Sequence, residues 1–186
     1  FALENMYEAN YAGESENGVV GIIHIGAQYT SITLLQNGIS TFTGDLSLGG
    51  AYFTDSLAKQ LGVSVEAAET FKATGMLDGK KGLDLDATLR STTEELAEEI
   101  RRTVSLYGAV PSEDGDGLKM IFLSGGGAKL AGLRILLEER MGVPVRLSEP
   151  FRVFNVSKNI DRDYLLDAAP YFAVGAGLSI RRPGDK

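Results

Sequence analysis

The stretch Leu123-Ser124-Gly125-Gly126-Gly127-Ala128-Lys129-Leu130-Ala131-Gly132 says more about the fold of this chain than any other segment. The apolar run Lys119–Leu123 that leads into it is typical of a buried strand, and a helical pattern follows from Leu130. Three glycines between a strand and a helix let the backbone come close to a ligand, and the first N–H groups of a helix suit a phosphate. The stretch therefore predicts a strand, a glycine turn and a helix that together contact a ligand.

The apolar pattern of the rest of the chain places the other elements around this turn. Strands are predicted over Val19–Ile25, Thr30–Gln36, Ile39–Leu46, Lys119–Leu123 and Val143–Leu147. Asn37-Gly38 predicts a two-residue hairpin turn, because both residues tolerate positive φ. Pro144 predicts that its strand lies at an edge of the sheet. Helices are predicted over Ala2–Tyr11, Val65–Ala73, Ala87–Tyr107, Arg134–Met141 and Pro170–Ile180, with exposed loops over Gly75–Asp86 and Ser112–Gly117. A further helix follows Gly49-Gly50, with Phe53, Leu57 and Leu61 on one face, and Gly62 ends it.

Composition excludes several classes of protein. The 186 residues are 44% apolar and 23% charged, as in an ordinary globular domain. A formal net charge of −7 argues against nucleic acid as a partner, because phosphate backbones are bound by clustered Lys and Arg. The chain lacks cysteine, which excludes disulfides and thiolate metal sites and fits a cytoplasmic location. It begins at Phe1 rather than Met, so we expect it to be a fragment of a longer protein.

The order of the predicted elements indicates an α/β fold. Three strands joined by hairpin-type turns come first, and helix, strand, helix, strand and helix follow. This order resembles the ribonuclease-H-like unit that is duplicated in the actin-like ATPases. The resemblance implies domain II of such a protein, with a mixed five-stranded sheet, flanking helices and a small inserted helical subdomain. A single copy of the unit implies that the other half, domain I, is absent from this chain.

The turn between the first two strands is a second candidate ligand loop. The segment Ile23–Ile32 resembles the second phosphate loop of actin-like ATPases, in which glycines and hydroxyl residues hold the phosphates of a nucleotide. The resemblance assigns Gly26, Ala27, Gln28 and Thr30 to the phosphate site. A plain β-hairpin loop without a ligand is the alternative interpretation of this segment.

Two further segments complete the candidate nucleotide site. Gly125, Gly126 and Gly127 resemble the adenosine loop of the same superfamily, where glycine backbone lies against the nucleoside. Glu69 and Lys72 are three residues apart, so they share one face of a helix and can reach one ligand together. The resemblance gives this acid and this lysine contacts to ribose and adenine. A tight strand-to-helix turn and an ordinary ion pair on a solvated helix are the alternatives.

Motifs along the whole chain are similar to the PilM family of type IV pilus assembly proteins, which are relatives of the cell-division protein FtsA. They are Phe1–Glu8, Gly26-Ala27, Phe42–Asp45 with Gly49-Gly50, Glu66–Lys72, Leu123–Ala128, Gly142–Val145 with Pro150-Phe151, and Ala173–Leu178. The resemblance implies a linker helix from domain I (1–17), a ribonuclease-H-like core (18–61 and 108–168), an inserted subdomain (62–107) and a C-terminal helix that packs on domain I (169–186). Without domain I, we expect the first and last helices to pack on each other or on a second molecule.

The same resemblance implies a function. A protein of this family would be a nucleotide-binding cytoplasmic scaffold, peripheral to the inner membrane, that links the alignment complex to the pilus motor in twitching motility. Its partners would be the N-terminal cytoplasmic tail of PilN, bound through domain I, the motor and platform proteins, and a second copy of itself. Its cofactor would be ATP with Mg²⁺ in the full-length protein. The alternatives are an FtsA-like filament protein and an active ATPase or kinase of the superfamily.

His24 departs from the superfamily pattern, which has an Asp at this position to place the water bound to magnesium. Neutral imidazole is a poor ligand for Mg²⁺, which prefers oxygen. We therefore expect slow hydrolysis of ATP at most in the full-length protein, and none in this chain alone. His24 is also the only histidine, and no Gly-x-Ser-x-Gly segment surrounds a serine, so a serine-hydrolase triad has no support.

Overall fold

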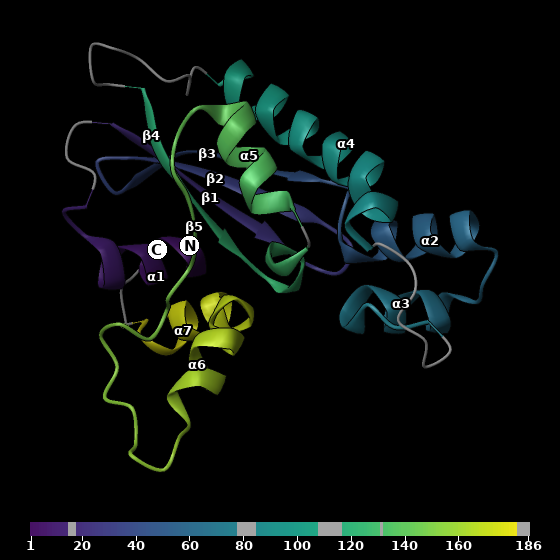
Figure 1. Ribbon diagram of the computed structural model, residues 1–186. Coiled ribbons are helices and arrows are strands. Elements are labelled where there is room, and N and C mark those ends of the chain that lie inside the picture. Colours follow the sequence, from purple (N-terminus) through teal and green to yellow (C-terminus); the bar gives the residue numbers. More distant parts are fainter. Residues whose placement is uncertain (15–17, 78–84, 108–116, 131, 182–186) are drawn as a thin grey trace.

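A mixed five-stranded sheet forms the centre of the computed structural model, which describes residues 1–14, 18–77, 85–107, 117–130 and 132–181 (Figure 1). The strands are β1 (Val19–Ile25), β2 (Thr30–Gln36), β3 (Ile39–Leu46), β4 (Leu118–Ser124) and β5 (Val145–Leu147), in the order β3-β2-β1-β4-β5. β1 pairs antiparallel with β2 and parallel with β4. The two edge strands are β3, which pairs antiparallel with β2, and β5, which pairs parallel with β4. The predicted mixed sheet and the predicted edge position of β5 are confirmed.

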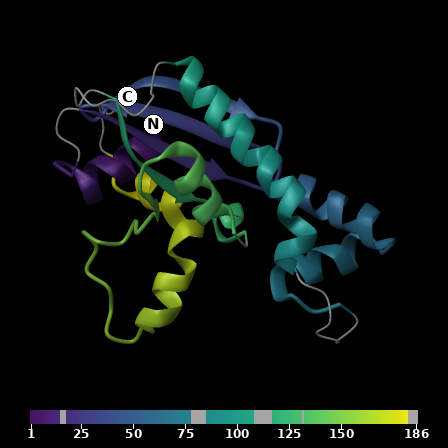
Figure 2. The same ribbon diagram turned by 45° about the horizontal axis from the view of Figure 1, so that its top comes forward.

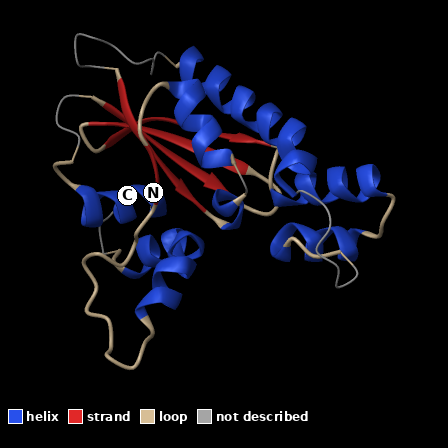
Figure 3. Cartoon of the chain, viewed as in Figure 1, coloured by secondary structure: helices blue, strands red, loops and turns tan. Residues whose placement is uncertain are grey.

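Helices cover both faces of the sheet (Figures 1, 2 and 3). They are α1 (Ala2–Tyr11), α2 (Gly50–Leu61), α3 (Val65–Thr74), α4 (Leu85–Leu106), α5 (Leu133–Met141), α6 (Arg162–Ala168) and α7 (Ala173–Ser179), with short 3-10 helices η1 (Gly126–Lys129) and η2 (Ala169–Phe172). α4 and α5 lie on the face opposite α1 and α7, and α2 and α3 lie side by side at one end (Figures 1 and 2). Within the described residues, no helix is long and apolar enough to cross a membrane.

The side chains of strand β1 alternate between two apolar cores, one on each face of the sheet. Ile23 and Ile25 belong to the larger core, together with buried side chains of α2, α3, α4 and α5. Val20 and Ile22 belong to the second core, which α1 and Ala173 of α7 complete. Successive side chains of a strand point to opposite faces, so a strand buried on both sides needs an unbroken apolar run.

Several helices end where capping residues in the sequence predict. Gly62 follows α2 with a φ of 65°, a left-handed conformation that glycine adopts without steric cost. The Ser64 hydroxyl accepts a hydrogen bond from the amide of Ala67 (3.2 Å) at the start of α3. Gly142 ends α5 in the same way as Gly62, with a φ of 67°.

Helices α1 and α7 pack on each other and against the sheet. Tyr7 and Tyr11 of α1 place their rings 5.8 and 4.3 Å from the ring of Phe122 on β4. Gly177 of α7 is buried so close to α1 that an added Cβ would overlap the backbone carbonyl of Ala2. This agrees with the expectation that the two helices contact each other. Packing of both helices on a domain I stays a prediction, as do the subdomain boundaries.

The region after the glycine turn differs from the sequence prediction. The helical pattern predicts a helix from Leu130, but α5 begins at Leu133. Residues Gly126–Lys129 form η1, and Gly132 adopts a φ of 73° before α5 starts. The chain therefore changes direction once at Gly125, before η1, and again at Gly132, before α5. A pattern of apolar residues does not reveal such turns.

The C-terminal region and the start of α4 also differ from the prediction. The helix predicted over Pro170–Ile180 is divided into η2 and α7, and α6 was not predicted. Asp161 caps α6, since its carboxylate accepts a hydrogen bond from the amide of Tyr164 (2.9 Å). α4 begins at Leu85, two residues before the predicted start. Residues 78–84, from the predicted loop before α4, and residues 108–116 lie outside the described part of the chain.

Candidate functional site

Five segments that are far apart in the sequence surround a cleft of about 660 Å³ at the end of β1 and β4. We call it the glycine cleft, because glycines from three of these segments form its walls. Its lining residues are Gly26, Ala27, Gly50, Ala51, Glu69, Lys72, Ala73, Gly126, Gly127, Lys129, Leu130 and Tyr171. The structure thus brings together six of the predicted site residues, which are Gly26, Ala27, Glu69, Lys72, Gly126 and Gly127. Gln28, Thr30 and Gly125 are outside this lining.

The loop between β1 and β2 is held by the N-terminus of α2. The amides of Gly50 and Ala51 donate to the carbonyls of Gly26 (2.9 Å) and Ala27 (2.7 Å). A Cβ at position 49 would lie 2.5 Å from the carbonyl carbon of Gln28, so only glycine permits this approach. These bonds use carbonyls of the loop, and no described residue accepts a hydrogen bond from the Ala27 amide. The amide is thus free for a ligand.

Thr30 and Gln28 lie outside the lining of the glycine cleft. Thr30 is buried, and its hydroxyl donates to the carbonyl of Leu48 (2.5 Å), where it ties β2 to the segment before α2. Gln28 is exposed at the tip of the loop and does not line the cleft. The geometry gives Thr30 a structural role, whereas a contact of Gln28 with phosphate stays a prediction.

The three glycines of the turn after β4 have different roles. A Cβ at Gly125 would overlap the carbonyl of Ile25, and a Cβ at Gly127 would overlap the Ile25 side chain. Gly125 also has a φ of 82°, and its amide donates to the carbonyl of Pro170 (2.7 Å). Gly126 is the least enclosed of the three, because a Cβ there would approach only the Tyr171 side chain, whose ring edge would lie at 3.1 Å. Gly125 and Gly127 are therefore needed for packing, and Gly126 opens the cleft.

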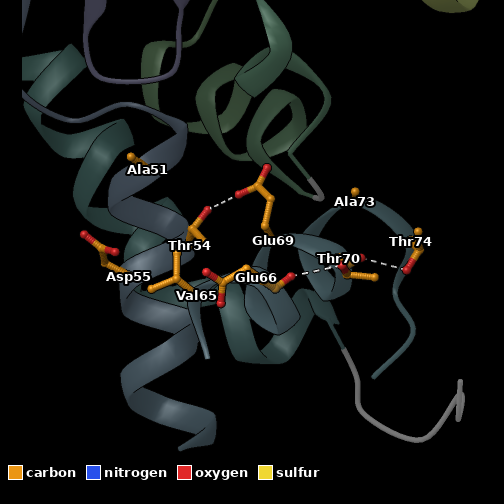
Figure 4. A pocket seen from close by; sticks show the side chains of 9 residues that line it. All are labelled: Ala51, Thr54, Asp55, Val65, Glu66, Glu69, Thr70, Ala73 and Thr74. Carbon is orange, nitrogen blue, oxygen red and sulfur yellow. Dashed lines mark hydrogen bonds between the residues drawn. The ribbon is translucent and has the colours of Figure 1, made fainter. Parts of the chain in front are cut away.

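Glu69 and Lys72 form a hydrogen-bonded cluster with Thr54 of α2. The Lys72 ammonium donates to Glu69 Oε2 (2.7 Å), Thr54 Oγ1 (2.8 Å) and the carbonyl of Gly50 (3.0 Å). The Thr54 hydroxyl donates to the same Glu69 oxygen, as Figure 4 shows. Burial alone would raise the pKa of Glu69, but the hydrogen bonds from Lys72 and Thr54 lower it below its ordinary value. Glu69 is therefore a carboxylate, and all three Lys72 donors are used within the protein.

Replacing Lys72 by methionine should loosen α3 from α2. Lys72→Met leaves Thr54, the Gly50 carbonyl and a carboxylate without their shared donor, which costs about 1–3 kcal/mol for partly buried groups. We expect the free energy of unfolding, measured with urea, to fall by about that amount. Lys59→Met, on the exposed last turn of α2, is the matched control and should change it by less than about 0.5 kcal/mol. Equal effects of the two substitutions would contradict this role of Lys72.

Lys129 and Tyr171 line the cleft but were not selected from the sequence. Lys129 Nζ lies 2.5 Å from the Asp167 carboxylate and 5.7 Å from the centre of the Tyr171 ring. The Tyr171 ring is more than half exposed. Lys129 is two residues after Gly127 in the sequence, so it could have been selected from its place beside the glycine turn. Tyr171 lies 45 residues after Gly126, and only the folding of η2 onto the turn brings it there.

A second, shallower pocket of about 640 Å³ continues from the glycine cleft between α2 and α3 (Figure 4). It shares Ala51, Glu69 and Ala73 with the cleft. Asp55 and Glu66 contribute carboxylates to its lining. Glu69 therefore stands between the two hollows and can face a ligand in either.

His24 lies beside the cleft rather than in its lining. Its Nδ1 is 3.0 Å from the hydroxyl of Ser124, which is fully buried on β4. Burial lowers the pKa of His24 below the ordinary value of 6.5, because desolvation disfavours the charged imidazolium. His24 is thus neutral near pH 7.

The lowered pKa of His24 predicts a pH-dependent stability. The unfolded chain takes up the proton near pH 6.5 and the folded chain only at lower pH, so protons favour unfolding between the two pKa values. The free energy of unfolding should therefore fall as the pH decreases from about 7.5 to about 5.5, more for the wild type than for His24→Gln, which cannot titrate there. Urea unfolding at several pH values would measure this. Parallel curves for the two proteins would contradict it.

Comparison with known proteins identifies the family. The model of the family described as type IV pilus assembly protein PilM matches residues 1–183. The chain belongs to the PilM family. PilM proteins take part in type IV pilus assembly, which confirms that part of the function implied by the sequence motifs.

Solved structures confirm the actin-like fold. The structure of a PilM–PilN type IV pilus biogenesis complex is 28% identical, with a TM-score of 0.80, and the match covers 97% of this chain and 52% of the other. The ethanolamine utilization protein EutJ from Carboxydothermus hydrogenoformans is 18% identical (TM-score 0.65; 96% and 53% covered). MreB5 of Spiroplasma citri bound to AMPPNP is 15% identical (TM-score 0.64; 96% and 57% covered). The chain spans about half the length of each of these proteins.

Proposed function

We propose that this chain is the part of a PilM-family protein that binds ATP with Mg²⁺ in the glycine cleft. The full-length protein would then be a cytoplasmic scaffold, peripheral to the inner membrane, that links the inner-membrane alignment complex to the pilus motor. The observation that supports nucleotide binding best is the meeting of Gly26-Ala27, Gly50, Glu69 and Gly126 around one cleft. The family resemblance had assigned all of these except Gly50 to the site of a nucleotide.

The dimensions and chemistry of the cleft fit a nucleotide. A volume of about 660 Å³ lies within the range of about 300–1,000 Å³ that is usual for small-molecule sites. At Gly26, Gly50 and Gly126 the wall of the cleft is bare backbone, which allows close contact with phosphate or a flat base. A free Ala27 amide suits phosphate, and the second oxygen of the Glu69 carboxylate suits a ribose hydroxyl.

Lys129 and Tyr171 would hold the base end of the nucleotide. The Tyr171 ring stands beside Gly126 and offers an exposed aromatic face for stacking. The Asp167 carboxylate holds Lys129 near this ring. Mg²⁺, when bound with ATP, would neutralise charge on the phosphates, which are its usual ligands. Lys72 would position Glu69 and the start of α2 rather than contact the nucleotide itself.

Partners are proposed from the family and from the complex of its member with PilN. We propose that the N-terminal cytoplasmic tail of PilN binds the full-length protein through domain I. The pilus motor, the platform proteins and a second copy of the protein complete the proposed set of partners. His24 in place of Asp supports a scaffold with slow ATP turnover at most.

Calorimetric titration of the full-length protein with Mg-ATP tests nucleotide binding. We expect saturable binding, and about a tenfold loss of affinity in Glu69→Ala, since a hydrogen bond to a charged group contributes about 1.5–3 kcal/mol. Glu94→Ala, an exposed residue of α4, is the control and should bind as the wild type does. A wild type that binds no ATP would refute the nucleotide site. Rapid phosphate release would instead favour the ATPase alternative over the scaffold.

A further inference from the structure

A row of polar side chains crosses four strands at the end of the sheet next to the glycine cleft. In the strand register, His24 of β1 lies opposite Ser124 of β4 and Ser31 of β2, and Ser31 lies opposite Asp45 of β3. Directly opposed residues share one face of a sheet, here the face of Val20 and Ile22 that α1 covers. His24 is the member of the row that is adjacent to the cleft loop.

The two hydrogen bonds of the row leave one imidazole nitrogen unused. His24 Nδ1 lies 3.0 Å from Ser124 Oγ, and the Ser31 hydroxyl donates to Asp45 Oδ1 (2.6 Å). No described residue forms a hydrogen bond with His24 Nε2. This nitrogen lies 3.9 Å from the place where a Cβ of residue 26 would stand. Since residue 26 is glycine, it places no side chain of its own beside Nε2.

Ser124 determines which imidazole nitrogen carries the proton. A neutral imidazole has one N–H and one acceptor nitrogen, and the hydrogen bond at one nitrogen selects the state of the other. The imidazole nitrogen is a stronger acceptor than a hydroxyl oxygen, which favours donation from the Ser124 hydroxyl to Nδ1. The proton of His24 therefore resides on Nε2, the nitrogen next to Gly26.

We propose that His24 is a phosphate-binding residue, which donates a hydrogen bond from Nε2 to the phosphate chain of a bound nucleotide beyond its α-phosphate. Ser124 is the positioning residue that keeps the proton on Nε2. The inference rests on the proposed function, because it needs a nucleotide in the glycine cleft. An acidic residue at position 24 would hold a hydrated cation. His24 would instead donate a hydrogen bond directly to the phosphate oxygens.

Calorimetric titrations of the full-length protein with ATP and with AMP test this role. His24→Leu should weaken ATP binding about tenfold and change AMP binding less than about twofold, because only ATP carries the contacted phosphates. His24→Gln, whose amide can still donate, should recover most of the ATP affinity. Ser124→Ala should weaken ATP binding about threefold, because the proton is then free to move to Nδ1.

Imidazole ¹⁵N chemical shifts provide a readout that a purely structural role would not change. In the wild type we expect Nε2 to be the protonated nitrogen, with its resonance shifted by ATP and not by AMP. Equal losses of ATP and AMP affinity in His24→Leu, or no loss of either, would overturn the inference while the nucleotide site stands. A wild type that binds neither nucleotide would overturn the proposed function and this inference with it.

Discussion

Gly177→Ala should destabilise the chain by about 3 kcal/mol or more, which is the largest effect on stability that we expect from any single methyl group here. The added Cβ would overlap the carbonyl oxygen and carbon of Ala2, and both are backbone atoms that cannot rotate away. α7 would have to move from α1, which opens the second core around Met6 and Ala173. Urea unfolding followed by circular dichroism measures the change.

Gly175→Ala is the matched control, since it adds the same methyl group to the same helix. Gly175 is exposed, and no heavy atom lies within 4 Å of the place where its Cβ would stand. Alanine is the better helix former, so this variant should be more stable by about 0.5–1 kcal/mol. Two variants that shift stability in the same direction would show that α1 and α7 do not pack as described.

Gly126→Val should weaken ATP binding by at least about tenfold, which is the largest effect on binding that we expect in the cleft. The Cβ would stand 3.1 Å from the ring edge of Tyr171, and its two methyl groups would fill the space between them. The nucleoside would lose both the bare backbone and the aromatic face. Gly126 has a negative φ, so valine itself adds little backbone strain.

Calorimetry gives the affinity, and urea unfolding separates binding from folding. We expect the free energy of unfolding of Gly126→Val to stay within about 1 kcal/mol of the wild type, because the Tyr171 side chain is exposed and can rotate away. Gly175→Ala should bind ATP as the wild type does. An unchanged ATP affinity in Gly126→Val would remove this turn from the nucleotide site.

The sequence was sufficient for those elements whose residues interact mainly with their neighbours in the chain. The bounds of β1, β2 and β3 agree with the prediction, because turn residues separate the three strands and β1 is a nearly unbroken apolar run. The predicted turn at Asn37-Gly38 is confirmed as well, since Asn37 has a φ of 53° and Gly38 a φ of 79°. α6 was missed because its apolar residues are largely exposed: Leu166 is 60% and Tyr164 is 66% accessible to solvent. A helix without a buried apolar stripe leaves no periodic signal.

For the candidate site, the sequence indicated which loops could contact a ligand but not what each residue in them does. Gly125, Gly126 and Gly127 are identical in type, and only the position of Ile25 separates the two packing glycines from the open one. Lys72 could be expected to reach a ligand from its place on α3. Its actual partners, Thr54 and the Gly50 carbonyl, lie on another helix.

The sequence by itself determined the class of fold, the strand order in the first hairpins, the family and three of the segments that line the glycine cleft. These properties depend on local pattern, on turn chemistry and on motifs that can be read in order along the chain. Tertiary structure alone decided that Tyr171 lies beside Gly126, that Ser124 lies within hydrogen-bond distance of His24, and that the backbone of Ala2 packs against Gly177. Each of these contacts joins residues more than 40 positions apart, and their approach depends on how the two cores pack rather than on any local pattern.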